Sequence, residues 1–251
     1  AQMRRTEIIR TGDICQPLGI SSKQERELFS RMSRRGIIIR LVRGLYLLPM
    51  RMPPGGKFAV GDYCILSKLM KSVAARYQIC GPNAFNIHGF SEQIPNRTYV
   101  FNDKFSGGRV IGGLQFVFIK RDVGKLGGTQ ILKTGDKERV FISTKERSLI
   151  DALDEWSRFA TMPQAFEWIE KSVKHDKSFA GAIVRCAVKY ASQGTLRRLG
   201  YALDRTFGDY SVTCPLIKKI RSSKSFIPLV PGKPARGGID RKWGIIRNDC
   251  K

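Results

Sequence analysis

The chain has 251 residues, 42% of them hydrophobic and 26% charged, a composition that excludes a disordered or membrane-embedded protein and leaves room for two domains. Its 45 lysines and arginines against 21 acids give a formal net charge of +24, more than solubility requires, which favours a polyanionic partner such as a nucleic acid or an anionic membrane surface. No apolar run approaches the ~18 residues of a membrane span and the first residues lack a signal-peptide core, which predicts a cytoplasmic protein with no membrane partner.

The first fifty residues predict a winged helix-turn-helix. A first helix is expected over residues 3–9, a short second helix over 13–18, and a turn at 18–20. Pro17 weakens the prediction of the second helix, because a proline past the first turn removes a backbone donor.

The third helix of this unit has the clearest signals. Ser21 with Gln24, or Ser22 with Glu25, forms a capping box at its start, and Gly36 is suited to a left-handed stop at its end. The periodicity places apolar side chains on one face and polar side chains on the other, as expected for a helix that packs on one side only.

A wing and a linker follow the third helix. The hydrophobic period changes to two over residues 37–42, a tight reversal is expected at 43–44, and a returning strand at 45–48. The proline and glycine residues of 52–57 indicate a linker. The predicted domains are therefore a DNA-binding domain at 1–51 and a C-terminal domain at 58–251.

The C-terminal domain alternates helical and extended patterns. Strands are expected at 77–80, 97–101, 114–120 and 139–142, with glycine turns at 107–108, 112–113 and 127–128. Helices are expected at 58–73, 144–156 with Ser143 as cap, 163–172, 179–190 and 195–205, and a closing hairpin within 226–248. The predicted fold class is α+β, with the winged helix-turn-helix followed by a larger mixed α/β domain.

The predicted winged unit suggests which residues contact DNA. A recognition helix presents its N-terminal residues to base edges, and a wing contacts the backbone or minor groove. Glutamine pairs with adenine and arginine or lysine with guanine, whereas phosphate contacts position the protein. Two alternatives remain open. The two serines could serve only to cap the helix, and the tyrosine could serve only to pack the hairpin. The predicted residues are Ser21, Ser22, Lys23, Gln24, Arg26, Arg34, Arg40, Arg43 and Tyr46.

A second basic surface is expected near the C-terminus. The pattern of residues 195–203 turns leucines inward and Arg197 with Arg198 outward. Together with Lys218, Lys219 and Arg221 these arginines would form a polyanion-binding surface, and a solvated basic face is the alternative.

Metal and catalytic patterns do not emerge from the sequence. The six cysteines form no C-x-x-C pair and His88 and His175 lie far apart, so reduced thiols, no metal and no cofactor are expected. Asp151 and Glu155 are neighbours on one predicted helix, either on a solvated face or as partners of nearby arginines. We therefore expect a protein that is not an enzyme. The alternatives are a nuclease targeted by the winged helix and an RNA-binding protein.

Four strings in this order carry a resemblance: RLVRGLY at 40–46, YQICGPNAF at 77–85, SLIDA at 148–152 and GTLRRLGY at 194–201. They resemble the AbiEi family, the antitoxin component of type IV abortive-infection toxin-antitoxin systems. The resemblance implies a DNA-binding repressor of its own operon, which we expect to bind inverted repeats in the promoter. It also implies that the C-terminal domain opposes a nucleotidyltransferase-like toxin, without necessarily forming a stable complex.

Overall fold

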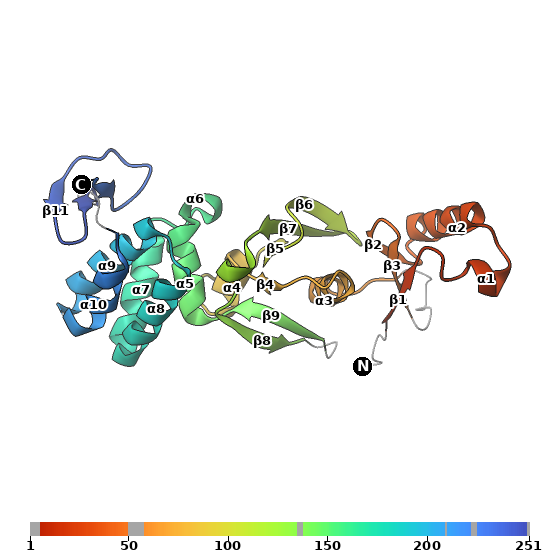
Figure 1. The fold of residues 1–251 in the computed structure, drawn as a ribbon, viewed down its shortest axis with the longest axis horizontal. Helices are drawn as coiled ribbons and strands as arrows, with labels where there is room; N and C mark the ends of the chain where they lie inside the picture. Colours follow the sequence, from red (N-terminus) through yellow and green to blue (C-terminus); the bar gives the residue numbers. More distant parts are fainter. Residues whose placement is uncertain (1–5, 50–57, 135–137, 209, 222–224, 250–251) are drawn as a thin grey trace. The chain divides into compact units, whose positions relative to one another are not determined.

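The computed structural model describes residues 6–49, 58–134, 138–208, 210–221 and 225–249. Contacts divide the chain into two compact units, whose elements are labelled in Figure 1. The first unit comprises Ala1–Ile79, Asn96–Val123 and Ile131–Phe141, and the second comprises Cys80–Pro95, Gly124–Gln130 and Ile142–Lys251. The predicted α+β class, with an N-terminal winged helix and a larger mixed part, is confirmed.

The two units differ from the domains expected from the sequence. The first unit contains both the N-terminal winged module and most of a six-stranded sheet. The domain division into residues 1–51 and 58–251 stays a prediction, and the expected linker at 52–57 lies outside the described residues.

The winged module has one strand where a helix was expected. Its elements are β1 (Thr6–Arg10), α1 (Cys15–Leu18), α2 (Ser22–Arg34), β2 (Ile39–Val42) and β3 (Leu45–Pro49). The prediction of a helix at 3–9 is wrong, because β1 pairs antiparallel with β3 and completes a sheet of order β1-β3-β2. The adjacent β-branched residues Ile8 and Ile9 suit an extended backbone.

Helix α2 begins and ends as the sequence predicts. Ser21 Oγ accepts a hydrogen bond from the Gln24 amide at 3.3 Å, and Gln24 Oε1 accepts one from the Ser21 amide at 2.8 Å. The capping box is therefore the Ser21–Gln24 pair and not the Ser22–Glu25 pair. Gly36 follows with a φ of 69°, the left-handed conformation expected after the last turn.

A small apolar cluster holds α2 against the wing. It consists of Phe29, Ile38 and Tyr46, and the rings of Phe29 and Tyr46 lie 4.6 Å apart. Each such buried side chain contributes ~1.5–3 kcal/mol relative to an exposed position. The position of α2 on the sheet is therefore set by packing.

The rest of the first unit is built on a six-stranded sheet of order β6-β7-β5-β4-β9-β8. Strands β5 and β7 are parallel, and β4 and β6 run antiparallel to their partners. Asp62 Oδ2 accepts a hydrogen bond from Thr98 Oγ1 at 2.6 Å, which ties α3 to β5. The elements are α3 (Asp62–Ser72), β4 (Tyr77–Ile79), β5 (Arg97–Asn102), β6 (Gly107–Ile111), β7 (Leu114–Lys120), η1 (Val123–Lys125), β8 (Thr129–Lys133) and β9 (Arg139–Ser143).

Two of these strands, β6 and β8, are missing from the sequence-based expectation. Gly107 and Gly108 were expected to form a turn, but both lie in β6 and pair with β7. Strand β8 lies at the edge of the sheet and exposes even Ile131, so its sequence has no alternating pattern to detect.

The second unit is a group of helices with a small terminal sheet (Figure 1). The helices expected at 163–172, 179–190 and 195–205 are confirmed, and α10, which contains Pro215, was not expected. Strands β11 and β12 form the predicted closing hairpin, and β10 adds to β12 in parallel. The elements are α4 (Pro82–Ile87), α5 (Lys145–Asp154), α6 (Trp156–Phe159), α7 (Gln164–His175), α8 (Lys177–Tyr190), α9 (Gln193–Phe207), α10 (Tyr210–Lys219), β10 (Ile227–Pro228), β11 (Gly238–Asp240) and β12 (Ile245–Arg247).

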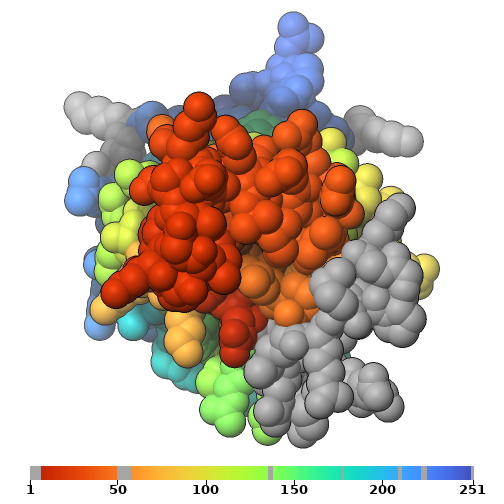
Figure 2. Space-filling model, turned by 90° about the vertical axis from the view of Figure 1, so that its right-hand side faces the viewer, coloured from red at the N-terminus to blue at the C-terminus, as the bar shows by residue number. Residues whose placement is uncertain are grey.

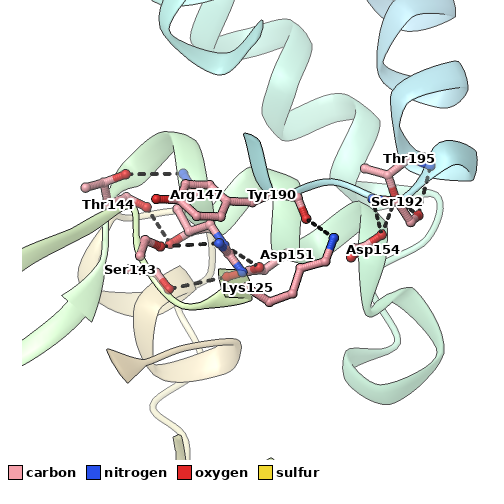
Figure 3. Close-up of polar contacts among 11 residues, drawn as sticks. Lys125, Ser143, Thr144, Arg147, Asp151, Asp154, Tyr190, Ser192 and Thr195 are labelled. Carbon is pink, nitrogen blue, oxygen red and sulfur yellow. Dashed lines mark hydrogen bonds and ion pairs between the residues drawn. The ribbon is translucent and has the colours of Figure 1, made fainter. Parts of the chain in front are cut away.

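A buried polar network anchors α5 in the second unit (Figure 3). Arg147 Nε donates to Asp151 Oδ1 at 2.8 Å, and Arg147 Nη1 donates to the Gly127 carbonyl at 3.3 Å. The helix is capped by Thr144, not by Ser143 as expected; Ser143 Oγ donates instead to Asp151 Oδ2 at 3.3 Å. Burial raises the pKa of Asp151, and the Arg147 guanidinium opposes this rise.

These contacts decide between the two alternatives that the sequence left open for the acids of α5. Asp151 is buried and paired with Arg147, so it is a partner of an arginine and does not lie on a solvated face. Glu155 pairs with Arg158 at 3.0 Å, as the spacing suggested. Close by, Asp154 Oδ1 accepts hydrogen bonds from Thr195 Oγ1 at 2.7 Å and the Ser192 amide at 3.2 Å, which joins α5 to the start of α9 (Figure 3).

Within the described residues, no helix is both long enough and apolar enough to cross a membrane. The five cysteines described there, Cys15, Cys64, Cys80, Cys186 and Cys214, are free thiols, as expected. Cys250 lies outside the described residues.

Candidate nucleic-acid interface

The outward face of α2 is polar and carries most of the predicted recognition residues. Ser21, Ser22, Lys23 and Arg26 are exposed at its start, and Arg34 is exposed at its end. Phe29 and Glu25 are buried on the opposite side. The capping box and the apolar cluster therefore present the N-terminal turn of α2 to solvent, which is the end that a recognition helix inserts into a groove.

Gln24 is exposed, but its side chain already has a structural role. Its Oε1 atom accepts from both the amide and the hydroxyl of Ser21, at 2.8 and 3.0 Å. Bidentate pairing with adenine needs that same oxygen. In the capped conformation Gln24 therefore offers a base only its amide nitrogen, a restriction that sequence reasoning did not foresee.

Tyr46 does not lie on the surface as the DNA-binding prediction assumed. Its side chain is 7% exposed and packs on Phe29 in the module's apolar cluster. The structure therefore shows the alternative role that the sequence left open for Tyr46, which is packing. Tyr46 therefore supports the wing from inside.

The wing is a short hairpin with two exposed arginines. Arg40 lies on β2 and Arg43 lies in the turn that connects β2 to β3. Gly44 has a φ of 76° in that turn, and its carbonyl accepts a hydrogen bond from the Thr11 amide at 3.0 Å. This hydrogen bond ties the tip of the wing to the end of β1. It therefore fixes the position of the turn that carries Arg43.

Glu25 is a functional position that sequence reasoning missed. Its carboxylate is fully buried and accepts hydrogen bonds from the Gly12 amide at 2.7 and 2.9 Å and from the Ile14 amide at 3.3 Å. It thereby holds the segment before α1 against α2. The available signal was its position one turn before Phe29, on the buried face of the helix.

The described part of the winged module, residues 6–49, exposes many cationic side chains. Figure 2 views the molecule from the side of this module, which is drawn in red and orange. The acids of the module are fewer, and Glu25 is buried in the contact just described. No ion pair within the described residues holds any of the module's arginines or its lysine. The exposed cations are Arg10, Lys23, Arg26, Arg31, Arg34, Arg35, Arg40 and Arg43.

The expected second basic surface is corrected at two positions. Arg197 is 8% exposed and donates to the Ser225 carbonyl at 2.9 Å, and Arg198 donates to the Pro228 carbonyl at 3.2 Å. Burial lowers the pKa of Arg198. Both arginines therefore fasten α9 to the segment that leads into the terminal sheet. Lys218, Lys219 and Arg221 are exposed, and their role in binding stays a prediction.

The described residues contain no group of three or more histidine, cysteine, aspartate or glutamate side chains placed to hold a metal ion. His88 Nε2 lies 2.8 Å from the Ser143 carbonyl and so carries the proton of that hydrogen bond. His175 is exposed at the end of α7.

Comparison with known proteins agrees with this geometry. Residues 1–49 match the family model described as "Transcriptional regulator, AbiEi antitoxin". Among solved structures, the RV2827C protein from Mycobacterium tuberculosis is similar, with a TM-score of 0.60 and 14% identity over 95% of this chain and 85% of that one. Such a likeness shows a shared fold. No curated protein matches the chain.

Proposed function

We propose that the protein is a DNA-binding repressor of its own operon, because its residues 1–49 match the family model of the AbiEi antitoxin transcriptional regulators. Its target is promoter DNA with inverted repeats. The N-terminal turn of α2 contacts the base edges of this DNA, and the wing contacts its phosphates. The observation that carries this proposal is the set of unpaired, exposed cations on α2 and the wing.

The physical basis is the division of labour between the two elements. Lys23 and Arg26 lie near the N-terminal end of α2, the end of a recognition helix that enters the major groove. Contacts to base edges there discriminate between DNA sequences. Arg40 and Arg43 lie on the wing, where contacts to phosphates add affinity without discrimination. Such contacts release counterions, so binding falls steeply as salt rises.

The second part of the proposal is that the protein is an antitoxin. We propose that the C-terminal part opposes a nucleotidyltransferase-like toxin, with or without a stable complex. Support comes from the family match of residues 1–49 and from the resemblance of the strings at 148–152 and 194–201 to that family. The helices that carry these strings, α5 and α9, are joined by the hydrogen bond from Thr195 to Asp154. The proposal assigns no catalytic residue, and the protein acts by binding in the cytoplasm.

Two rival functions are tested alongside it. A nuclease targeted by the winged helix would cleave DNA or RNA when supplied with magnesium or manganese. An RNA-binding protein would prefer structured RNA to the promoter duplex.

The experiment separates the two parts of the proposal in cells. A reporter behind the protein's own promoter measures repression, and growth after induction of a nucleotidyltransferase toxin measures antitoxin activity. We expect Arg40→Ala combined with Arg43→Ala to relieve repression while growth protection persists. Repression that survives this double substitution contradicts the DNA-binding part, and a lack of protection by the unsubstituted protein contradicts the antitoxin part.

A further inference from the structure

The second unit contains a groove of about 780 Å³ that the proposed function does not use. One side is the outward face of α7, and the other is the segment His88–Gln93 together with Lys145 at the start of α5. Ligand sites in proteins commonly have volumes of ~300–1,000 Å³. The groove is therefore large enough for a small molecule of nucleotide size.

Aromatic rings form part of the groove lining. Phe90 and Trp168 stack with their ring centres 5.7 Å apart and their planes at 22°. The ammonium group of Lys145 lies 5.8 Å from the centre of the Phe90 ring and 5.5 Å from that of Phe179. The groove therefore combines a flat π surface with a fixed positive charge, the two features that bind a base and a phosphate.

Charge is unevenly distributed along the groove. Lys171 and His175 lie in the last turns of α7. Lys145 lines the same groove, and its ammonium group contacts the ring of Phe179 near the start of α8. Gln164 and Glu167 lie at the opposite end of α7, and seven residues from Gln164 to Lys171 correspond to ~10 Å of helix. Along α7, one end is therefore cationic and the other offers an amide and a carboxylate, while Glu92 on the facing segment is a further acid of the lining.

The charged groups of the groove form no ion pair with one another or with other described residues. None of Lys145, Lys171, His175 and Glu167 takes part in an ion pair there, whereas Glu170 and Lys174, which do not line the groove, pair at 2.5 Å. Charges that line a groove and lack ion-pair partners are available to a ligand.

We propose that this groove binds a nucleoside phosphate whose base carries an exocyclic amine. The base stacks on Phe90, its amine donates to Glu167 and its ring nitrogen pairs with Gln164, in the manner of base-edge recognition. The phosphate lies between Lys145 and Lys171, which bind it through charge-assisted hydrogen bonds. The nucleotide is either free or the end of a single-stranded RNA.

The test measures binding of AMP, adenosine and inorganic phosphate to the full chain by calorimetry and by Trp168 fluorescence. Stacking of a base beside Trp168 should quench its emission, and the signal should vanish in Trp168→Phe. We expect AMP to bind about tenfold more tightly than adenosine, because adenosine lacks the charged contact. An RNA hexamer ending in adenosine distinguishes the two sources: tighter binding than AMP indicates an RNA end, and weaker binding indicates a free nucleotide.

Substitutions locate the ligand. Lys171→Ala should weaken AMP binding about tenfold and leave adenosine binding unchanged. Lys174→Ala removes a lysine that pairs with Glu170 and does not line the groove, so it should alter neither. Both residues are exposed, so folding is retained, and promoter binding serves as the check on the winged module. The proposal is overturned if neither AMP nor the hexamer binds at millimolar concentration, or if Lys171→Ala binds AMP as tightly as the unsubstituted protein.

Discussion

The carboxylate of Glu25 accepts the amide hydrogen of Gly12 at 2.7 Å, thirteen residues back along the chain. Gly12 has a φ of 105°, a conformation that other residues rarely adopt, so the glycine and the glutamate together define this turn. The contact positions α1 on α2, and through it the surface that we propose to meet DNA.

Replacing Glu25 should therefore destabilise the winged module. Glu25→Ala leaves the Gly12 and Ile14 amides without their acceptor, at a cost of about 1–3 kcal/mol. Chemical denaturation measures the loss. Glu27→Ala, on the exposed face of the same helix, should change stability by less than ~0.5 kcal/mol. If the two substitutions lowered the unfolding free energy equally, the buried Glu25 contact would not contribute more to stability than an exposed side chain does.

The wing arginines should contribute to affinity through phosphates. Arg40→Ala and Arg43→Ala should each weaken binding to all duplexes alike and lower the slope of log K against log salt by about one. Anisotropy titrations at several salt concentrations give the slope. Arg158→Ala, which breaks a surface ion pair in the second unit, is the control and should leave the slope unchanged. A change in sequence preference without a change in slope would exclude phosphate contacts.

Tyr46 should act through packing. Tyr46→Phe keeps the ring against Phe29 and should preserve both stability and DNA affinity. Tyr46→Ala leaves a cavity and should cost ~3–5 kcal/mol, as for other buried aromatic residues. Thermal unfolding and promoter binding are the two readouts. If Tyr46→Phe lost DNA affinity while its stability stayed unchanged, the Tyr46 hydroxyl would have to contact DNA.

Two tyrosines of the first unit make its stability depend on alkaline pH. Burial and the nearby Asp62 raise the pKa of Tyr63 to about 12, and burial is the main cause that raises the pKa of Tyr77 to about 12. A raised pKa means that the folded state holds the proton more tightly than the unfolded chain. The stabilisation is full below pH 10 and is lost as pH rises from about 10 to 12.

Replacing both tyrosines with phenylalanine should flatten this alkaline loss of stability. Chemical denaturation at about pH 9, 10 and 11 measures how the unfolding free energy depends on pH. A decline as steep as in the unsubstituted protein would mean that other groups cause it.

Local signals in the sequence predicted much of the fold. Helix α2 was predictable because its capping box and left-handed glycine are encoded within fifteen residues or so. Strand β1 was not, because its partner β3 lies more than thirty residues away and only the pairing makes Thr6–Arg10 a strand. The edge strand β8 escaped detection for a related reason, since exposure on every side leaves no periodicity.

The sequence predicted which side chains of the candidate site are exposed when they make no contact with a distant part of the chain. It failed where a side chain is held by a hydrogen bond to another residue. Exposed cations such as Lys23 and Arg43 follow from helix periodicity and from the reversal of the wing. Arg197 does not, because an arginine that appears to face outward on a helical wheel is buried once the segment after α10 folds back to it. Gln24 reads as a base contact in the sequence, yet its oxygen caps the helix.

The most direct test of the account compares the protein's own promoter duplex with a scrambled duplex of the same length and composition, at physiological salt. We predict that the unsubstituted protein prefers the promoter by a factor of ~10³ or more. The variant carrying Lys23→Ala and Arg26→Ala, still folded by circular dichroism, should lose ~1–3 kcal/mol of discrimination for each base contact removed. Equal affinity of the unsubstituted protein for the two duplexes would contradict the account.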